Sequence, residues 1–279
     1  MSAEHENLRL EKADIDADAS GRTLMALRGH TDWVKGIAVD GATGAMFSCS
    51  NDGTVRAWEA SGKSSWVFRG HNGVVYCVAS DSARGRVISG GNDRTVRAID
   101  AATGEQAFVC EGHTGHVVSV AVDSDGGRIF SGSDDRTIRV WSADDGAHLM
   151  TMEGHTNTVL CLAFESVSGR LFSGGYDRTV RAWGADGAAL FVCEGHGDWV
   201  SCLAVDGANG RVFSGSYDGI VIAWSVENGD ELFRIDCGGH DYVISLAFDS
   251  VSSRLFVSCG NPFRVIALAV SAGAFTLAT

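Results

Sequence analysis

The dipeptide Gly-His recurs along this sequence at a nearly constant interval. The copies are Gly29-His30, Gly70-His71, Gly112-His113, Gly154-His155, Gly195-His196 and Gly239-His240, so successive copies lie 41, 42, 42, 41 and 44 residues apart. Self-similarity at this period indicates one supersecondary unit that is repeated and stacked, because a single unit of this size cannot bury its own apolar face. The chain therefore contains six related units.

Other residue types recur at fixed distances from each histidine. A serine follows 18 residues later in all six units, an aspartate 22 residues later in five, and a tryptophan 28 residues later in four. The four complete sets are His30, Ser48, Asp52 and Trp58; His113, Ser131, Asp135 and Trp141; His155, Ser173, Asp177 and Trp183; and His196, Ser214, Asp218 and Trp224. The second unit has Ile99 at the tryptophan position, and the sixth has Pro262 and Leu268 at the aspartate and tryptophan positions.

Each unit holds four short apolar runs separated by turn residues. In the fourth unit the runs are residues 159–164, 170–173, 179–183 and 189–193, and helical spacing is not found. Thirty-six glycines against one proline fit many tight turns between strands that keep their N–H groups. Four strands per repeat predict an all-β chain, a β-propeller of four-stranded antiparallel blades.

With Gly-His, an aspartate before the third strand and a tryptophan at that strand's end, the chain resembles the WD-repeat β-propeller family. The resemblance covers about residues 22–279 and implies that each His, Ser, Asp and Trp set forms a hydrogen-bonded structural network within its blade. We favour six blades. The alternative is seven, with an incomplete blade that includes the acidic segment of residues 1–21.

The closure of the ring has two interpretations. In the resembled family the N-terminal strand commonly completes the last blade, and residues 23–27 have a suitable sequence for this. Alternatively, residues 275–278 complete the sixth blade, which leaves the N-terminal segment for a partial seventh blade or for pairing with another chain.

The composition and motifs argue against several classes of function. Serine, histidine and aspartate together suggest a hydrolase, but five units carry them at equal offsets, so we expect no catalytic residue, and a hydrolase is only a remote alternative. Six of the nine histidines are spread one per unit, so we expect no metal site, and no phosphate-binding loop or other cofactor motif is found. The formal charge of −13 disfavours nucleic acid.

The cysteines and the N-terminus bear on the compartment. The eight cysteines lie in apolar runs without a C-x-x-C pair, which fits a reducing environment, and the sequence shows neither a secretory signal nor a run of membrane-spanning length. We therefore expect a cytoplasmic or nuclear protein that is not secreted and does not bind membranes.

The resemblance implies that residues at three further positions after each histidine lie on the face that these propellers use for docking. The residues at 3, 5 and 21 positions after the histidine are not needed by the blade, and they include many aromatic side chains. In the last unit, whose loop is one residue shorter in the sequence alignment, Tyr242 takes the first of these positions at two residues after His240. The candidate binding residues are Trp33, Lys35, Tyr76, His116, Leu160, Tyr176, Trp199, Tyr217 and Tyr242.

Aromatic anchors in an acidic chain favour a protein or peptide partner of basic or amphipathic character. The leading hypothesis is a non-enzymatic interaction scaffold without a cofactor. The competing hypothesis is a homo-oligomer that assembles through terminal strands, and the aromatic side chains have the simpler interpretation that they only cover loop backbone.

Overall fold

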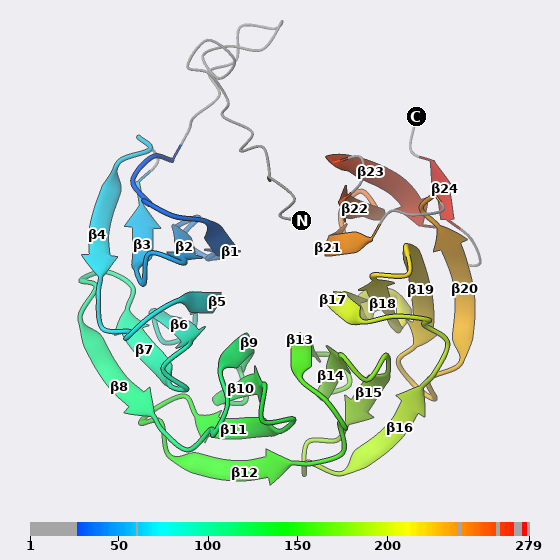
Figure 1. Cartoon of the computed structure of the whole chain (residues 1–279), viewed down its shortest axis with the longest axis horizontal. Coiled ribbons are helices and arrows are strands. Elements are labelled where there is room, and N and C mark those ends of the chain that lie inside the picture. The colour runs from blue at the N-terminus through cyan, green and yellow to red at the C-terminus, as the bar shows by residue number, and fades with distance from the viewer. Residues whose placement is uncertain (1–26, 60, 239–241, 261–262, 271–274, 278–279) are drawn as a thin grey trace, which may run out of the picture.

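The computed structural model describes residues 27–277 except 60, 239–241, 261–262 and 271–274, and it shows six sheets arranged around one axis (Figure 1). Each sheet is a four-stranded antiparallel blade whose strands follow chain order. The blades are β1 (Val34–Val39), β2 (Met46–Ser50), β3 (Val55–Trp58), β4 (Ser64–Phe68); β5 (Val75–Asp81), β6 (Arg86–Gly91), β7 (Val96–Asp100), β8 (Gln106–Cys110); β9 (Val117–Asp123), β10 (Arg128–Ser133), β11 (Ile138–Ser142), β12 (His148–Met152); β13 (Val159–Glu165), β14 (Arg170–Gly175), β15 (Val180–Trp183), β16 (Ala189–Cys193); β17 (Val200–Asp206), β18 (Arg211–Ser216), β19 (Ile220–Ser225), β20 (Glu231–Asp236); and β21 (Val243–Asp249), β22 (Arg254–Gly260), β23 (Phe263–Val270), β24 (Phe275–Leu277). The predicted all-β propeller is confirmed, and the described residues form six blades.

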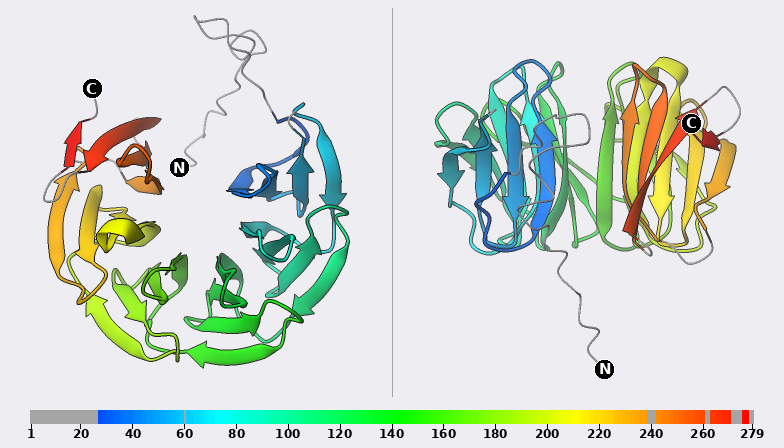
Figure 2. Two further views of the ribbon diagram at one scale, coloured as in Figure 1. Left: turned by 180° about the vertical axis from the view of Figure 1, so that it is seen from behind. Right: turned by 90° about the horizontal axis from the view of Figure 1, so that it is seen from above.

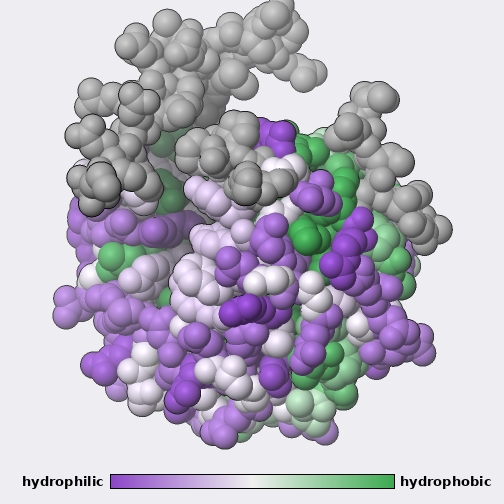
Figure 3. All heavy atoms as spheres, turned by 45° about the vertical axis from the view of Figure 1, so that its right-hand side comes forward, coloured by the Kyte–Doolittle hydropathy of each residue, from purple (hydrophilic) through white to green (hydrophobic). Residues whose placement is uncertain are grey.

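The first strand of every blade lies nearest the axis and the fourth lies at the rim (Figure 1). Seen from above, the strands run along the axis, so the loops gather at the two ends of the ring (Figure 2). The face shown in Figure 3 is mainly hydrophilic with patches of hydrophobic side chains. Exposed apolar residues on the outer strands include Leu190 of β16 and Leu232 of β20.

The turns between the second and third strands explain why the chain reverses at the same place in each blade. The residue after the repeat aspartate has a left-handed backbone, with φ of 79° at Gly53 and 80° at Gly219 but also 65° at Arg94 and 67° at Arg178. Glycine adopts this conformation without steric cost, whereas arginine tolerates it only where the surrounding structure holds it. The hydrogen bonds of the adjacent aspartate, described below, supply that restraint.

The hydrophobic core lies between blades, since each sheet face packs against the next sheet. One cluster joins Phe172 and Val180 of blade four to Val200, Val212 and Trp224 of blade five. Equivalent clusters occur at the other junctions between consecutive blades. A blade therefore gains most of its apolar burial only when its neighbour is present.

The sixth blade differs from the sequence-based alignment in one position. Leu246 pairs with Val257, just as Leu203 pairs with Ser214 in blade five. Val257 therefore occupies the place of the repeat serine, and the assignment of Ser258 to that place is wrong. The first strand of the sixth unit begins three residues after the repeat histidine, at Val243, whereas that of the fifth begins four residues after it, at Val200. Leu268 does pair with Leu255 as Trp224 pairs with Val212.

The C-terminal strand completes blade six, because β24 pairs with β23. Of the two interpretations of ring closure, the structure therefore supports the second, in which the C-terminal strand completes the sixth blade. The acidic segment of residues 1–21, and residues 23–27 except Leu27, lie outside the described residues.

Candidate functional site

One end of the ring carries the loops before the first strands and the turns between the second and third strands, because the strands of each blade alternate in direction. We call this end the loop face. The two kinds of segment are joined within each blade by a backbone hydrogen bond: the N–H of Tyr176 donates to Thr158 O at 3.0 Å, and that of Tyr217 donates to Trp199 O at 3.0 Å. Residues 3 and 21 positions after the repeat histidine therefore lie side by side.

A hydrogen-bond network beneath the loop face holds these segments in place. In blade four, His155 Nε2 lies 2.7 Å from Ser173 Oγ, His155 Nδ1 lies 2.7 Å from Asp177 Oδ2, and Trp183 Nε1 donates to Ser173 Oγ at 2.8 Å. Because a carboxylate only accepts, Nδ1 carries the proton in this arrangement. The same network links His30, Ser48, Asp52 and Trp58; His113, Ser131, Asp135 and Trp141; and His196, Ser214, Asp218 and Trp224.

The aspartate of each network also ties down the loops on both sides. Asp177 accepts hydrogen bonds from the backbone N–H of Thr156 at 3.0 Å and from the hydroxyl of Thr179 at 2.8 Å. Burial by itself raises the pKa of Asp177, but the hydrogen bonds from His155 and from these residues outweigh burial and hold its pKa well below the usual value. The carboxylate is therefore ionised and fully engaged at neutral pH.

These networks are not arranged for nucleophilic catalysis. Ser173 is completely buried, and its oxygen already contacts the indole of Trp183 and the imidazole of His155. A nucleophile has to reach the substrate carbonyl, which a buried serine cannot do. Within the described part of the chain, no group of three or more His, Cys, Asp or Glu side chains is placed to hold a metal ion.

The loop face carries a continuous row of aromatic rings over blades four, five and six. The ring centroids of Tyr176 and Trp199 are 4.3 Å apart, those of Trp199 and Tyr217 are 5.4 Å apart, and those of Tyr217 and Tyr242 are 5.2 Å apart. We call these four residues the aromatic row. Along the row, residues from the turn between the second and third strands of one blade alternate with residues from the loop before the first strand of the next blade. It is therefore a product of blade stacking, and Trp199, Tyr217 and Tyr242 keep more than a third of their surface exposed.

The same alternation produces polar contacts in blades three and four. His116 Nδ1 lies 3.0 Å from Asp134 Oδ2, and the hydroxyl of Thr158 donates to Asp134 Oδ1 at 3.1 Å. Tyr76 lies beside His116 with ring centroids 6.0 Å apart. The loop face thus has an aromatic sector and a polar sector.

The remaining candidates lie apart from the aromatic row. Lys35 Nζ lies 5.5 Å from the ring centroid of Trp33, within cation–π distance, and both belong to blade one. The described strands of blade one and blade six are separated by a gap (Figure 1), which we call the opening, and no core cluster of described residues joins these two blades. Leu160 is partly buried in β13. The nine candidates therefore form the row, the Tyr76 and His116 pair, the Trp33 and Lys35 pair, and Leu160.

One acidic residue beside the row was not among the sequence candidates. Asp198 Oδ1 accepts the backbone N–H of Trp199 at 2.8 Å, and its charge contributes to the raised pKa of Tyr217, of which burial is the main cause. Asp32 makes the same bond to Trp33 at 2.7 Å. The repeated triplet Asp-Trp-Val, at residues 32–34 and 198–200, was the sequence signal for this arrangement.

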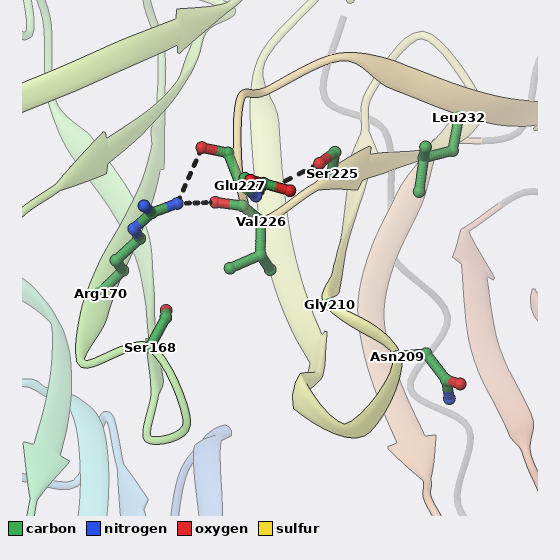
Figure 4. A pocket seen from close by; sticks show the side chains of 8 residues that line it. All are labelled: Ser168, Arg170, Asn209, Gly210, Ser225, Val226, Glu227 and Leu232. Atoms are coloured by element: carbon green, nitrogen blue, oxygen red, sulfur yellow. Dashed lines mark hydrogen bonds between the residues drawn. The ribbon is translucent and has the colours of Figure 1, made fainter.

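The opposite end of the ring holds a pocket between blades four and five, lined by Ser168, Arg170, Asn209, Gly210, Ser225, Val226, Glu227 and Leu232 (Figure 4). The Arg170 guanidinium reaches across the junction and donates to the carbonyl oxygens of Val226 and, at 2.9 Å, Glu227. Arg170 at the edge of this pocket therefore links blade four to blade five.

Repeated four-stranded blades with a His, Ser, Asp and Trp network define a WD-repeat β-propeller. The family model described as WD domain, G-beta repeat (WD40) matches residues 21–59, 62–100, 104–142, 146–184 and 187–225, which is more than half of the sequence. The chain therefore belongs to the WD40 repeat family. The matched stretches end before the sixth unit, in which Pro262 and Leu268 replace the family residues.

Similar proteins include fungal subunits of a ubiquitin ligase complex. The chain is 47% identical over 38 residues to the probable E3 ubiquitin ligase complex SCF subunit sconB of Emericella nidulans and to that of Arthroderma otae. Each match spans 14% of this chain and only 6% of the relative. The similarity is thus confined to about one repeat.

A crystal structure of the RRP9 WD40 repeats has the same fold. It aligns with a TM-score of 0.82 at 22% identity, over 91% of this chain and 82% of the other. WD40 propellers are generally non-enzymatic scaffolds for protein interactions, and this chain has their architecture.

Among the described residues there is no helix long and apolar enough to cross a membrane.

Proposed function

We propose that this propeller is a non-enzymatic scaffold that binds a peptide or protein segment along the aromatic row of Tyr176, Trp199, Tyr217 and Tyr242. The supporting observation is the contact between the four rings across three blades, at centroid distances of 4.3–5.4 Å. Clustered, partly exposed tryptophan and tyrosine side chains are typical anchors of protein interfaces.

The proposed partner carries a basic side chain next to apolar ones. A guanidinium or ammonium group gains from an aromatic face, and Asp198 at the edge of the row supplies a negative charge. The net charge of −13 adds a long-range attraction for a basic segment and repels acidic ones.

The family supports a protein partner without naming one. The SCF subunits named above are parts of ubiquitin ligase complexes, but the similarity of one repeat supports only the general role of the fold. Self-assembly through an unpaired C-terminal strand has less support, because β24 is already hydrogen-bonded within blade six.

The test is a screen of arrayed peptides against the purified full chain, with an Arg or Lys placed among apolar residues and with matched acidic sequences. For the peptides that bind, we expect Trp199→Ala and Tyr217→Ala each to weaken binding at least tenfold, since interface anchors of this kind contribute about 2 kcal/mol or more. Neither variant should lower the melting temperature by more than Leu190→Ala, a matched truncation at an exposed rim position.

Two results would contradict the proposal. One is that the row variants bind the selected peptides as well as Leu190→Ala does. The other is that acidic peptides bind as tightly as basic ones, which would remove the charge argument. Trp33→Ala, tested in parallel, measures whether the separate Trp33 and Lys35 pair takes part.

A further inference from the structure

Equivalent apolar residues of the six blades differ sharply in exposure at the opening of the ring. Val34, at the start of β1, is 50% exposed, whereas its counterparts in the other blades are all 0% exposed: Val75, Val117, Val159, Val200 and Val243. The strand β1 also exposes Ile37 and Val39. The face of blade one that is turned toward blade six therefore has the apolar residues of a blade junction, but no described residue covers them.

The facing side of blade six shows the same departure. Val265 pairs with Ser258 as Val221 pairs with Gly215 in blade five, yet Val265 is 69% exposed and Val221 is 0% exposed. Phe256, the counterpart of the buried Phe213, is 37% exposed. Both sides of the opening in Figure 1 thus carry apolar side chains that the other junctions bury.

The closed junctions show which strands supply the cover. Val117 of β9 lies against Gly90 of β6, where an added Cβ would come within 2.5 Å of Val117 Cγ1. Val159, Val200 and Val243 lie in the same way against Gly132, Gly174 and Gly215. On the other side of each junction, the first strand covers the previous blade, as Val243 and Leu246 cover Phe213 and Val221.

By analogy with the closed junctions, the exposed face of blade six requires the first strand of another blade as its cover. Val34 requires a small residue on the second strand of such a blade. The first two strands of a blade form a hairpin such as Val117–Ser133, joined by the turn between β9 and β10. In the repeat register, the third and fourth strands of a unit that precedes Gly29-His30 correspond to residues near 13–17 and 23–27, of which the structure describes only Leu27. The first and second strand positions have no counterpart in the 279 residues.

We propose that the opening between blade one and blade six binds a two-stranded antiparallel β-hairpin from outside these 279 residues, in the place of the inner half of a seventh blade. Its first strand carries Val and Leu side chains against Phe256 and Val265. Its second strand carries a small residue, Gly or Ala, over Val34. Both faces of the hairpin are apolar, because both are enclosed between sheets.

The site is independent of the aromatic row. The row lies on the loop face over blades four to six, whereas the hairpin site lies on the sheet faces that line the opening. Loss of one binding activity is therefore separable from loss of the other.

The test uses the full chain and a backbone-cyclised peptide that copies residues 115–135, an inner hairpin of this propeller without cysteine. Cyclisation is needed because an isolated two-stranded hairpin is only marginally stable in water. We expect the peptide to raise the melting temperature of the full chain in a concentration-dependent manner, since a ligand that binds only the folded state stabilises it.

Three variants make the test specific. In a calorimetric titration, Val34→Asp and Val265→Asp should each reduce the affinity for the peptide at least tenfold. Neither should lower the melting temperature of the free chain, because both side chains are exposed. Val167→Asp introduces the same charge at a 77% exposed position in the turn between β13 and β14 and should bind like the wild type. The row variant Trp199→Ala should also bind like the wild type.

The proposal is overturned if the cyclised peptide does not stabilise the wild-type chain, or if Val34→Asp and Val265→Asp bind it as Val167→Asp does. A second copy of the chain is the competing occupant. A wild-type dimer in sedimentation that both variants convert to monomers would assign the opening to that copy, and a monomeric wild type supports the hairpin.

Discussion

Replacing Asp177 with alanine removes the acceptor on which four donors of blade four converge. Asp177 accepts hydrogen bonds from the imidazole of His155, the backbone N–H of Thr156, and both the hydroxyl and the backbone N–H of Thr179. The donors differ in their access to water, and this difference determines the size of the effect. The side chain of His155 is only 1% exposed, whereas Thr156 lies at the surface.

The donor of His155 is buried, those of Thr179 are partly buried, and that of Thr156 is exposed, so the loss of the partner of His155 dominates the effect. A buried donor without a partner costs about 1–3 kcal/mol, while exposed donors regain most of their hydrogen-bond energy from water. We therefore expect Asp177→Ala to lower the free energy of unfolding by about 1–3 kcal/mol, and the melting temperature by roughly 2–4 °C for each kcal/mol.

The assay is thermal and urea-induced unfolding, followed by circular dichroism. The matched control is Asp186→Ala, in the exposed turn between β15 and β16, where the carboxylate accepts one backbone hydrogen bond from Ala188. If Asp177→Ala and Asp186→Ala unfold at the same midpoint, the network does not stabilise the blade and the reasoning is refuted.

Two further predictions concern pH and the joint between blades. The pKa of Asp218 is lowered to about 2 and that of Asp177 is also well below the usual value, so the unfolded chain takes up protons near pH 4 that the folded chain does not. The melting temperature should therefore fall as the pH is lowered below about 4, and less so in Asp177→Ala; an equal fall in the variant would contradict this. Arg170→Ala removes two hydrogen bonds to blade five and should lower the free energy of unfolding by about 1 kcal/mol, with partial recovery in Arg170→Lys, because lysine lacks the forked guanidinium. Urea unfolding beside the exposed control Arg69→Ala measures this effect, and equal midpoints for both alanine variants would refute it.

The blade itself was predictable because its determinants are local. The spacing of His155, Ser173 and Asp177 recurs in other units, and it reflects a fixed hairpin length between strands that a count along the chain can detect. The sixth unit shows the limit of counting. There the assignment of Ser258 fails and Val257 takes the position, since an offset is valid only while the loops have equal length.

The aromatic row was predictable in its residues but not in its contacts. The offsets selected Tyr176 and Trp199, yet these rings meet because blade five stacks on blade four. The same offsets give Asp134 and Thr158 a hydrogen bond elsewhere on the loop face. Which partner a side chain meets depends on the neighbouring blade, and periodicity does not contain that information.

The sequence by itself determined that the chain folds into four-stranded blades, because the strand alternation, the turns and the His, Ser, Asp and Trp network all operate within one repeat. Only the tertiary structure decided which blade faces have no neighbouring sheet among the described residues. Val34 and Val75 are the same residue at the same repeat position, but one is exposed and the other is buried. The physical reason is that blade faces are buried by their neighbours, so the environment of each valine depends on whether another sheet lies against it.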